Sequence, residues 1–219
     1  MFDWLTKHLR GEAATPRSRL RERLRDYPPF DPPHLGPASR WTDAQARENL
    51  AHVLAVRERR LAGLASWLDV EGIDLRPALG TGDWRPVLDA LHRWANDTWP
   101  SVHDPRIATP EVWDRTSYRG EEVVYALTFD VALLIGEVVI RRDARCRWDV
   151  NFDEGDGRDG MDSYRRVVLA VDLPEGSVTE HVEGMVMHRY LHPTSTLYQG
   201  HNGWAQMVSE CLSQGLGST

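Results

Sequence analysis

The chain of 219 residues contains a single lysine, Lys7, and its other strongly basic side chains are all arginine. A chain body without lysine cannot supply the Schiff-base lysine of a covalent enzyme or the lysine of a phosphate-binding loop. The sequence also lacks a G-x-S-x-G elbow, and no glycine-rich phosphate loop follows a predicted strand. These absences remove several classes of enzyme from consideration.

Cysteine is scarce as well, since Cys146 and Cys211 are too few for a disulfide framework. Cys146 falls on the apolar side of a predicted strand, where we expect a buried thiol. No apolar run reaches the roughly 18 residues of a membrane span. The N-terminus also lacks the apolar core and cleavage site of a secretory signal, so we expect a cytoplasmic protein.

Charge is spread unevenly along the chain. The formal net charge is -7, whereas residues 1–26 carry +3, so the remainder carries −10. Proteins that bind phosphate backbones extensively need clustered lysine and arginine, and an acidic body argues against such binding. We therefore expect no nucleic-acid partner.

The N-terminal residues 1–40 are predicted to be a helical extension followed by a connector. Residues 1–11 have apolar side chains at helical spacing, and a second charged helix is expected over 17–25. The prolines of Tyr27–Pro37 exclude helix and central strand and predict an extended segment. A helix as short as residues 1–10 binds membranes weakly, so we expect it to dock on the body of the protein.

Residues 41–219 are predicted to form a single α+β domain. Thr42 and Gln45 have the spacing of a capping box, and an apolar stripe then predicts a long helix over 43–68. Further helices are expected near 84–99, over 121–142, over 179–191 and over 204–212, with a proline-punctuated loop over 101–118.

The period of the apolar residues changes abruptly between Val123 and Asp153. After the helical segment, apolar side chains at 146, 148, 150 and 152 alternate with polar ones, which predicts a half-buried strand. Val167–Leu173 is apolar on both faces and predicts an interior strand that pairs antiparallel with the first. The fold class is therefore α+β: a helical N-terminal half packed on a small antiparallel sheet with flanking C-terminal helices.

Three charged residues, Asp130, Glu137 and Arg141, lie on one line of the largely apolar 121–142 helix, within about 40° of one another at 100° per residue. A structural role is one interpretation, with an (i, i+4) pair between Glu137 and Arg141 and with Asp130 capping a neighbouring loop. The other interpretation is a charged groove that receives a ligand or a basic side chain of a partner.

A second group of candidates is the acidic loop after the first strand. Its carboxylates are Asp153, Glu154, Asp156, Asp159 and Asp162. The spacing fails the calcium-binding EF-hand template, because Glu154 stands at the glycine position and Gly160 at the position of the bidentate glutamate. We expect a solvated hairpin tip, able to dock a basic partner, and no cofactor.

His188 and His192 have the i, i+4 spacing that places two imidazoles on one helix face for zinc. The glutamate of the zinc-protease motif is missing between them. With carboxylates from Asp149 or Asp153, these histidines define the alternative function, a metal-dependent hydrolase. His181 and His201 are further candidate ligands.

The Gly136-Glu137 dipeptide on a long helix, followed by a strand built around Arg147-Trp148, resembles a pattern in small uncharacterised bacterial α+β proteins. The resemblance covers residues 85–173, and some proteins of this kind are immunity or accessory proteins of toxin systems. It implies a cytoplasmic, non-enzymatic binding protein. The absence of a nucleophile, phosphate loop or metal motif and the acidic body motivate the leading hypothesis. It is a module that neutralises or accompanies another protein, such as a toxin or effector, through the 153–162 loop and the Asp130/Glu137/Arg141 line.

Overall fold

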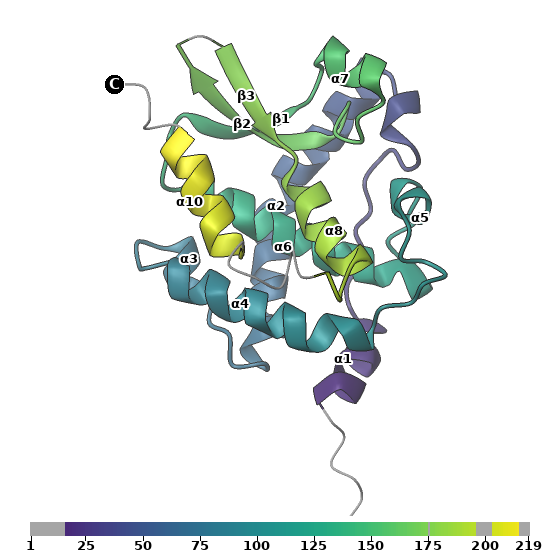
Figure 1. Ribbon diagram of the computed structural model, residues 1–219, viewed down its shortest axis with the longest axis vertical. Coiled ribbons are helices and arrows are strands. Elements are labelled where there is room, and N and C mark those ends of the chain that lie inside the picture. The colour runs from purple at the N-terminus through teal and green to yellow at the C-terminus, as the bar shows by residue number, and fades with distance from the viewer. Residues whose placement is uncertain (1–15, 175, 196–202, 215–219) are drawn as a thin grey trace, which may run out of the picture.

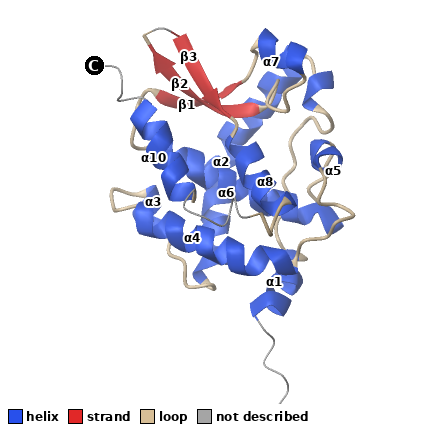
Figure 2. Ribbon diagram, viewed as in Figure 1, coloured by secondary structure: helices blue, strands red, loops and turns tan. Residues whose placement is uncertain are grey.

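The computed structural model describes residues 16–174, 176–195 and 203–214, which form helices and one three-stranded sheet. Figures 1 and 2 show the sheet at one end of the molecule with the core helices beneath it, which confirms the α+β class. The α-helices are α1 (Pro16–Leu24), α2 (Asp43–Asp69), α3 (Arg76–Leu79), α4 (Arg85–Thr98), α5 (Pro110–Asp114), α6 (Val124–Ile140), α7 (Glu154–Asp159), α8 (Val182–Leu191) and α10 (Trp204–Gln214). The 3-10 helices are η1 (Ala38–Arg40), η2 (Trp99–Ser101) and η3 (Gly120–Val123), and the strands are β1 (Cys146–Val150), β2 (Val167–Leu173) and β3 (Gly176–Glu180).

Helix α2 begins as the sequence predicts. The Thr42 hydroxyl accepts from the backbone N–H of Gln45 at 3.2 Å, and the Gln45 side chain accepts from the backbone N–H of Thr42 at 2.8 Å. This reciprocal capping box satisfies two donors that the first helical turn leaves free. The apolar stripe of α2 then packs on α6, with Leu61, Leu64 and Leu68 fully buried.

Helix α6 is the central helix of the core, and every residue from Val124 to Val139 is buried. It packs against α2, α3, α8, α10 and β1, so almost no face remains for solvent. With η3, the segment Gly120–Ile140 is long and apolar enough to cross a membrane, at a mean hydropathy of 2.1, although 94% of that window is buried inside the protein. The prediction that no apolar run is long enough to span a membrane is therefore wrong for Gly120–Ile140. Asp130 and Glu137 interrupt this segment, but its mean hydropathy stays high despite them.

Gly136 is the point of closest approach between α6 and β1. A Cβ atom at this position would lie 2.1 Å from Cη2 of Trp148, so the indole ring occupies the space that a side chain would need. The same ring donates its Nε1–H to Glu137 Oε1 at 2.9 Å. The two motifs that carry the resemblance, Gly136-Glu137 and Arg147-Trp148, are thus one packing unit.

The sheet has the order β1-β2-β3 and is antiparallel throughout. Along β1, Cys146, Trp148 and Val150 are buried while Arg147 is exposed, as the alternation predicts, and β2 is the interior strand. Strand β3 was not predicted, since the sequence reading began a helix at Thr179. That helix, α8, begins only at Val182, because residues 176–180 pair with β2 instead.

The acidic segment after β1 was predicted as a loop, but residues 154–159 form the short helix α7. The Asp153 carboxylate accepts from the backbone N–H groups of Gly155 at 2.6 Å and Asp156 at 3.2 Å, which is an N-cap. Gly160, at φ 69°, ends the helix in the left-handed conformation.

Replacement of Asp153 by alanine is expected to destabilise α7 by about 1 kcal/mol, because two helix N–H groups lose their acceptor. Hydrogen exchange of the 154–159 amides, followed by mass spectrometry, should become faster while exchange in α2 is unchanged. Asp159→Ala is the matched control, since it removes the same charge from the last turn, where a carboxylate is unfavourable. Equal exchange rates in the two variants would contradict the cap.

The predicted N-terminal extension and the predicted domain share one core. Leu20 and Leu24 of α1 and Tyr27 and Phe30 of the proline-rich segment are buried in the same apolar cluster as α2 and α6. The helix expected over residues 1–11 lies outside the described residues.

Candidate functional site

The predicted connector, Tyr27–Pro37, forms one wall of a pocket together with the residues that follow it as far as Trp41. Residues 27–41 are hereafter the arm. Its prolines prevent regular helix and sheet pairing, so its carbonyl oxygens need donors from elsewhere. Arg60 of α2 donates to the carbonyl oxygens of Pro29 at 2.7 Å and Pro28 at 3.3 Å. Further along, the backbone of His34 and the side chain of Asn49 exchange two hydrogen bonds of 3.0 Å. As predicted, residues 28–37 of the arm form neither helix nor strand, whereas residues 38–40 form η1. The arm is held at several points.

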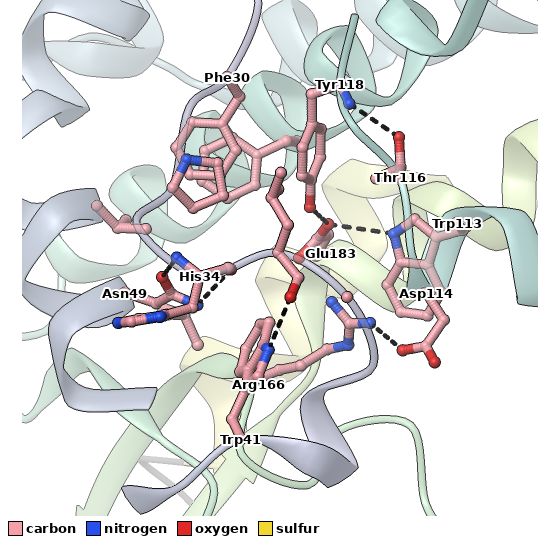
Figure 3. Close-up of a pocket in the computed structure, with 16 residues that line it drawn as sticks. Phe30, His34, Trp41, Asn49, Trp113, Asp114, Thr116, Tyr118, Arg166 and Glu183 are labelled. Carbon is pink, nitrogen blue, oxygen red and sulfur yellow. Dashed lines mark hydrogen bonds and ion pairs between the residues drawn. The ribbon is translucent and has the colours of Figure 1, made fainter. Parts of the chain in front are cut away.

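The aromatic pocket lies between the arm, α5 and the N-terminus of α8, and encloses about 450 Å³ including the solvent at its mouth. Figure 3 shows its aromatic walls, with Phe30 and Tyr118 on one side and Trp41 and Trp113 on the others. The Phe30 ring stacks on Phe129 at 3.9 Å and meets Tyr118 edge-on at 5.2 Å. The lining residues are Phe30, Pro32, His34, Leu35, Gly36, Trp41, Asn49, Val53, Trp113, Asp114, Thr116, Tyr118, Phe129, Arg166, Val167 and Glu183.

Glu183, in the first turn of α8, presents its carboxylate to this pocket. Its Oε1 accepts from the indole N–H of Trp113 at 3.2 Å and from the hydroxyl of Tyr118 at 3.4 Å (Figure 3). Burial, with the negative charge of Glu183 as the next cause, raises the pKa of Tyr118 well above 10, so the phenol stays a donor at neutral pH. Two aromatic donors therefore orient one carboxylate.

Arg166, at the entry to β2, is buried beside the pocket. Its Nη2 donates to Asp114 Oδ1 at 2.5 Å, and its Nε donates to the backbone oxygen of Asp162 at 3.1 Å. The guanidinium lies 4.1 Å from the ring centroid of Trp113 and 5.9 Å from that of Trp41. Its charge is thus matched by Asp114 and its plane is held by aromatic rings.

The backbone at this pocket is strained. Among the residues that the structure describes, the non-glycine residues with positive φ are Tyr118, at 56°, and Arg165, at 62°. The first lines the pocket and the second directly precedes Arg166. Such conformations are costly for bulky side chains and gather at functional sites, where the surrounding structure holds them in place.

A second hollow, the acidic groove, adjoins the aromatic pocket and shares Trp113 and Asp114 with it. It spans about 770 Å³ including the open solvent at its surface, and it is lined by Ala38, Ser39, Pro110, Glu111, Trp113, Asp114, Gly157, Gly160, Met161, Asp162 and Tyr164. Its charged lining residues, Glu111, Asp114 and Asp162, are all carboxylates. Met161 is 51% exposed beside them, so the groove combines negative charge with an accessible apolar side chain.

The Asp130/Glu137/Arg141 line does not form a groove. Asp130 is 1% exposed and accepts from Arg60 Nε at 2.5 Å, Arg60 Nη2 at 2.8 Å and the Tyr27 hydroxyl at 2.6 Å. The sequence proposal of Asp130 as a surface contact is corrected, because a carboxylate this deep inside the core cannot reach a partner. Its role in the fold is to hold α2, α6 and the arm together.

Glu137 and Arg141 do form the predicted (i, i+4) pair, at 3.4 Å. Glu137 is also buried, where it accepts from Trp148 and lies 3.8 Å from Arg57 Nε. Arg141 is exposed and donates to Leu79 O at 2.7 Å and to Glu58 Oε1 at 3.0 Å. The structural interpretation therefore accounts for both residues.

The carboxylates of the 153–162 segment are placed differently from one another. Asp153 caps α7, and Asp156 accepts from Asn151 at 2.6 Å and Ser163 at 3.1 Å. Glu154 and Asp159 are exposed on α7, which itself contributes Gly157 to the acidic groove. Asp162 lines that groove and lies 3.5 Å from His181 Nδ1, and the hydrogen bond with this imidazole lowers the pKa of Asp162.

In the described part of the chain, His188 and His192 are not joined by further ligands into a metal site. The rings of His188 and His192 are stacked with centroids 6.0 Å apart. Within residues 16–174, 176–195 and 203–214, no three His, Cys, Asp or Glu side chains are grouped to hold a metal ion, so Asp149 and Asp153 do not complete a site with them. His201 lies outside the described residues.

Sequence reasoning missed the residues of the aromatic pocket. Trp113 and Tyr118 lie in a segment predicted to be a loop, and Trp41 lies between the predicted connector and the predicted 43–68 helix. Glu183 lies in a predicted helix with no motif around it. The sequence feature that could have indicated them is the presence of large aromatic residues in proline-containing segments, since such side chains are usually buried. Their convergence depends on contacts between residues 52 to 125 positions apart, from Asp114–Arg166 to Trp41–Arg166.

Comparisons with known proteins give this chain no relatives. No protein-family model, no curated protein and no solved structure matches it.

Proposed function

We propose that this chain is a non-enzymatic protein-binding module, of the kind that neutralises or accompanies a bacterial partner protein. We assign the docking surface to the aromatic pocket and the acidic groove together. The observation that carries the proposal is their junction at Trp113 and Asp114, which joins an aromatic hollow to a groove lined by carboxylates.

The composition of this surface supports binding rather than a reaction. Tryptophan, tyrosine and arginine dominate the energetics of protein interfaces, and Trp41, Trp113, Tyr118 and Arg166 meet here. The charged groups at the pocket are engaged with one another or with aromatic donors, so none of them is arranged as a nucleophile beside a base.

Photo-crosslinking in the native cell tests the proposal. A photoreactive amino acid at Leu35, which is 52% exposed at the pocket mouth, should yield a discrete crosslinked protein on irradiation. The control is the same amino acid at Val70, which is 75% exposed beyond the C-terminal end of α2 and lines neither hollow. Equal crosslinking at both positions, or none at position 35, would contradict a docking surface here.

A further inference from the structure

Given the proposed binding function, on which this inference rests, the geometry points to the chemistry of the partner. We propose that the aromatic pocket receives a lysine or arginine side chain of the docking protein, and that the cationic head pairs with Glu183. The acidic groove then receives the neighbouring basic residues of the same segment.

Glu183 keeps one carboxylate oxygen for such a ligand. Its Oε1 accepts from Trp113 and Tyr118, whereas Oε2 makes no hydrogen bond with any residue in the described part of the chain. The side chain is half-buried and forms no ion pair there. A carboxylate in this position gains most from a cation that arrives with its own hydrogen-bond donors.

The cations already at the pocket do not neutralise Glu183. Arg166 is paired with Asp114 at 2.5 Å, and His34 at the mouth lies 2.5 Å from Glu48. The Arg166–Asp114 pair is neutral as a unit, so the charge of Glu183 remains uncompensated among the lining residues. The pocket therefore favours a cationic occupant over an anionic one.

The walls suit a long aliphatic stem. Lysine and arginine lay their methylene groups along apolar surface while their charged ends reach polar groups, and aromatic faces attract the cation itself. Phe30, Trp41 and Tyr118 supply this surface on the way to Glu183 (Figure 3). Arg166 already shows such an arrangement within the chain, since its guanidinium lies over Trp113.

The acidic groove favours a positively charged partner segment. Its ionisable lining residues, apart from Tyr164, are Glu111, Asp114 and Asp162. Asp114 already balances Arg166 and Asp162 lies 3.5 Å from His181, so within the described part of the chain Glu111 is the lining carboxylate without an ion pair. Complementary charge speeds encounter and disfavours partners of the wrong sign. An extended, lysine- or arginine-rich segment is therefore the occupant that matches both hollows.

Fluorescence anisotropy with three labelled peptides tests this inference on the full-length protein. Each is a short glycine-rich peptide with a lysine near both ends, and the central residue is arginine, its uncharged isostere citrulline, or glutamate. The wild-type protein should bind the arginine peptide about tenfold more tightly than the citrulline peptide, as expected for one partly buried ion pair. The glutamate peptide should bind most weakly.

Matched variants separate the two hollows. Glu183→Gln keeps an acceptor for Trp113 and Tyr118 but loses the charge, so it should remove the preference for arginine while both peptides still bind. Asp162→Asn should weaken the arginine and citrulline peptides equally. Asp89→Asn, which removes one exposed carboxylate from α4, should change neither.

The outcomes that differ from these expectations contradict different parts of the proposal. Equal affinity of the wild-type protein for arginine and citrulline overturns the role of Glu183 but leaves the groove as a docking surface. Preference for the glutamate peptide would make Arg166 the recognising group and overturn the inference. Failure of all three peptides to bind overturns the basic partner, while crosslinking at position 35 reports separately on the binding function.

Discussion

Replacement of Gly136 by alanine is expected to destabilise the folded state by about 3 kcal/mol. The added methyl group would lie 2.1 Å from Cη2 of Trp148, a distance at which the indole ring must move. Movement of the ring also breaks its hydrogen bond to Glu137, which would leave a buried carboxylate oxygen without that donor. Urea denaturation followed by far-UV circular dichroism measures the loss.

The control for this prediction is Gly63→Ala on α2, where no atom lies within 4 Å of the added methyl group. That substitution should stabilise the protein by up to about 1 kcal/mol, because alanine has the higher helix propensity. In a Trp148→Phe background, the shorter ring should make Gly136→Ala much less costly. An unchanged cost in that background would show that the ring is not the obstacle.

Replacement of Arg60 by methionine should cost about 3–5 kcal/mol, because it leaves the buried Asp130 carboxylate without its cation. The same change removes the donors to the arm at Pro28 and Pro29, so the wall of the aromatic pocket should loosen as well. Arg59→Met is the matched control, since Arg59 is the exposed neighbour on the same helix. It should change the free energy of unfolding by less than about 0.5 kcal/mol.

The cost of Arg60→Met should depend on pH in a defined direction. Burial raises the pKa of Asp130 from 3.8 to about 6, against the lowering effects of Arg60 and Tyr27. Because the pKa of Asp130 is raised in the folded state, its protonation stabilises the folded protein. This stabilisation is complete below pH 3.8 and is lost as the pH rises through 6. Without Arg60 the pKa rises further, so the variant should lose more stability at pH 8 than at pH 5.

Urea titrations of the Arg60→Met and Arg59→Met variants at the two pH values measure this dependence. The cost of the first should shrink by about 1–2 kcal/mol between pH 8 and pH 5, while that of the second stays constant. A cost that grows on acidification would mean that Asp130 is held ionised by groups other than Arg60.

Local patterns in the sequence predicted the framework well. The capping box at Thr42, the helix that follows, the alternation along β1 and the interior position of β2 all depend on residues close in sequence, and the structure confirms them. The errors were local as well. Residues 176–180 became a strand because β2 offered an open edge, and residues 154–159 became a helix because Asp153 could cap it.

The candidate site could not be predicted in the same way. Periodicity placed Asp130, Glu137 and Arg141 on one line of a helix, but it could not show that Arg60 and Arg57 of another helix meet two of them inside the core. Nor could it show that Glu183 would face Trp113 and Tyr118, which are 70 and 65 positions away. Side-chain partners so distant in sequence are chosen by packing alone.

By itself, the sequence determined that this protein is an α+β fold built around one buried helix, with a negatively charged body and no motif for a lysine-dependent or phosphate-loop reaction. Only the tertiary structure decided which charges are internal supports and which remain accessible. The physical reason is that hydrophobic spacing encodes the buried face of each element, whereas a pocket arises where loops from several elements meet. Here the arm, α5 and α8 meet, and Glu183 is left facing the space between them.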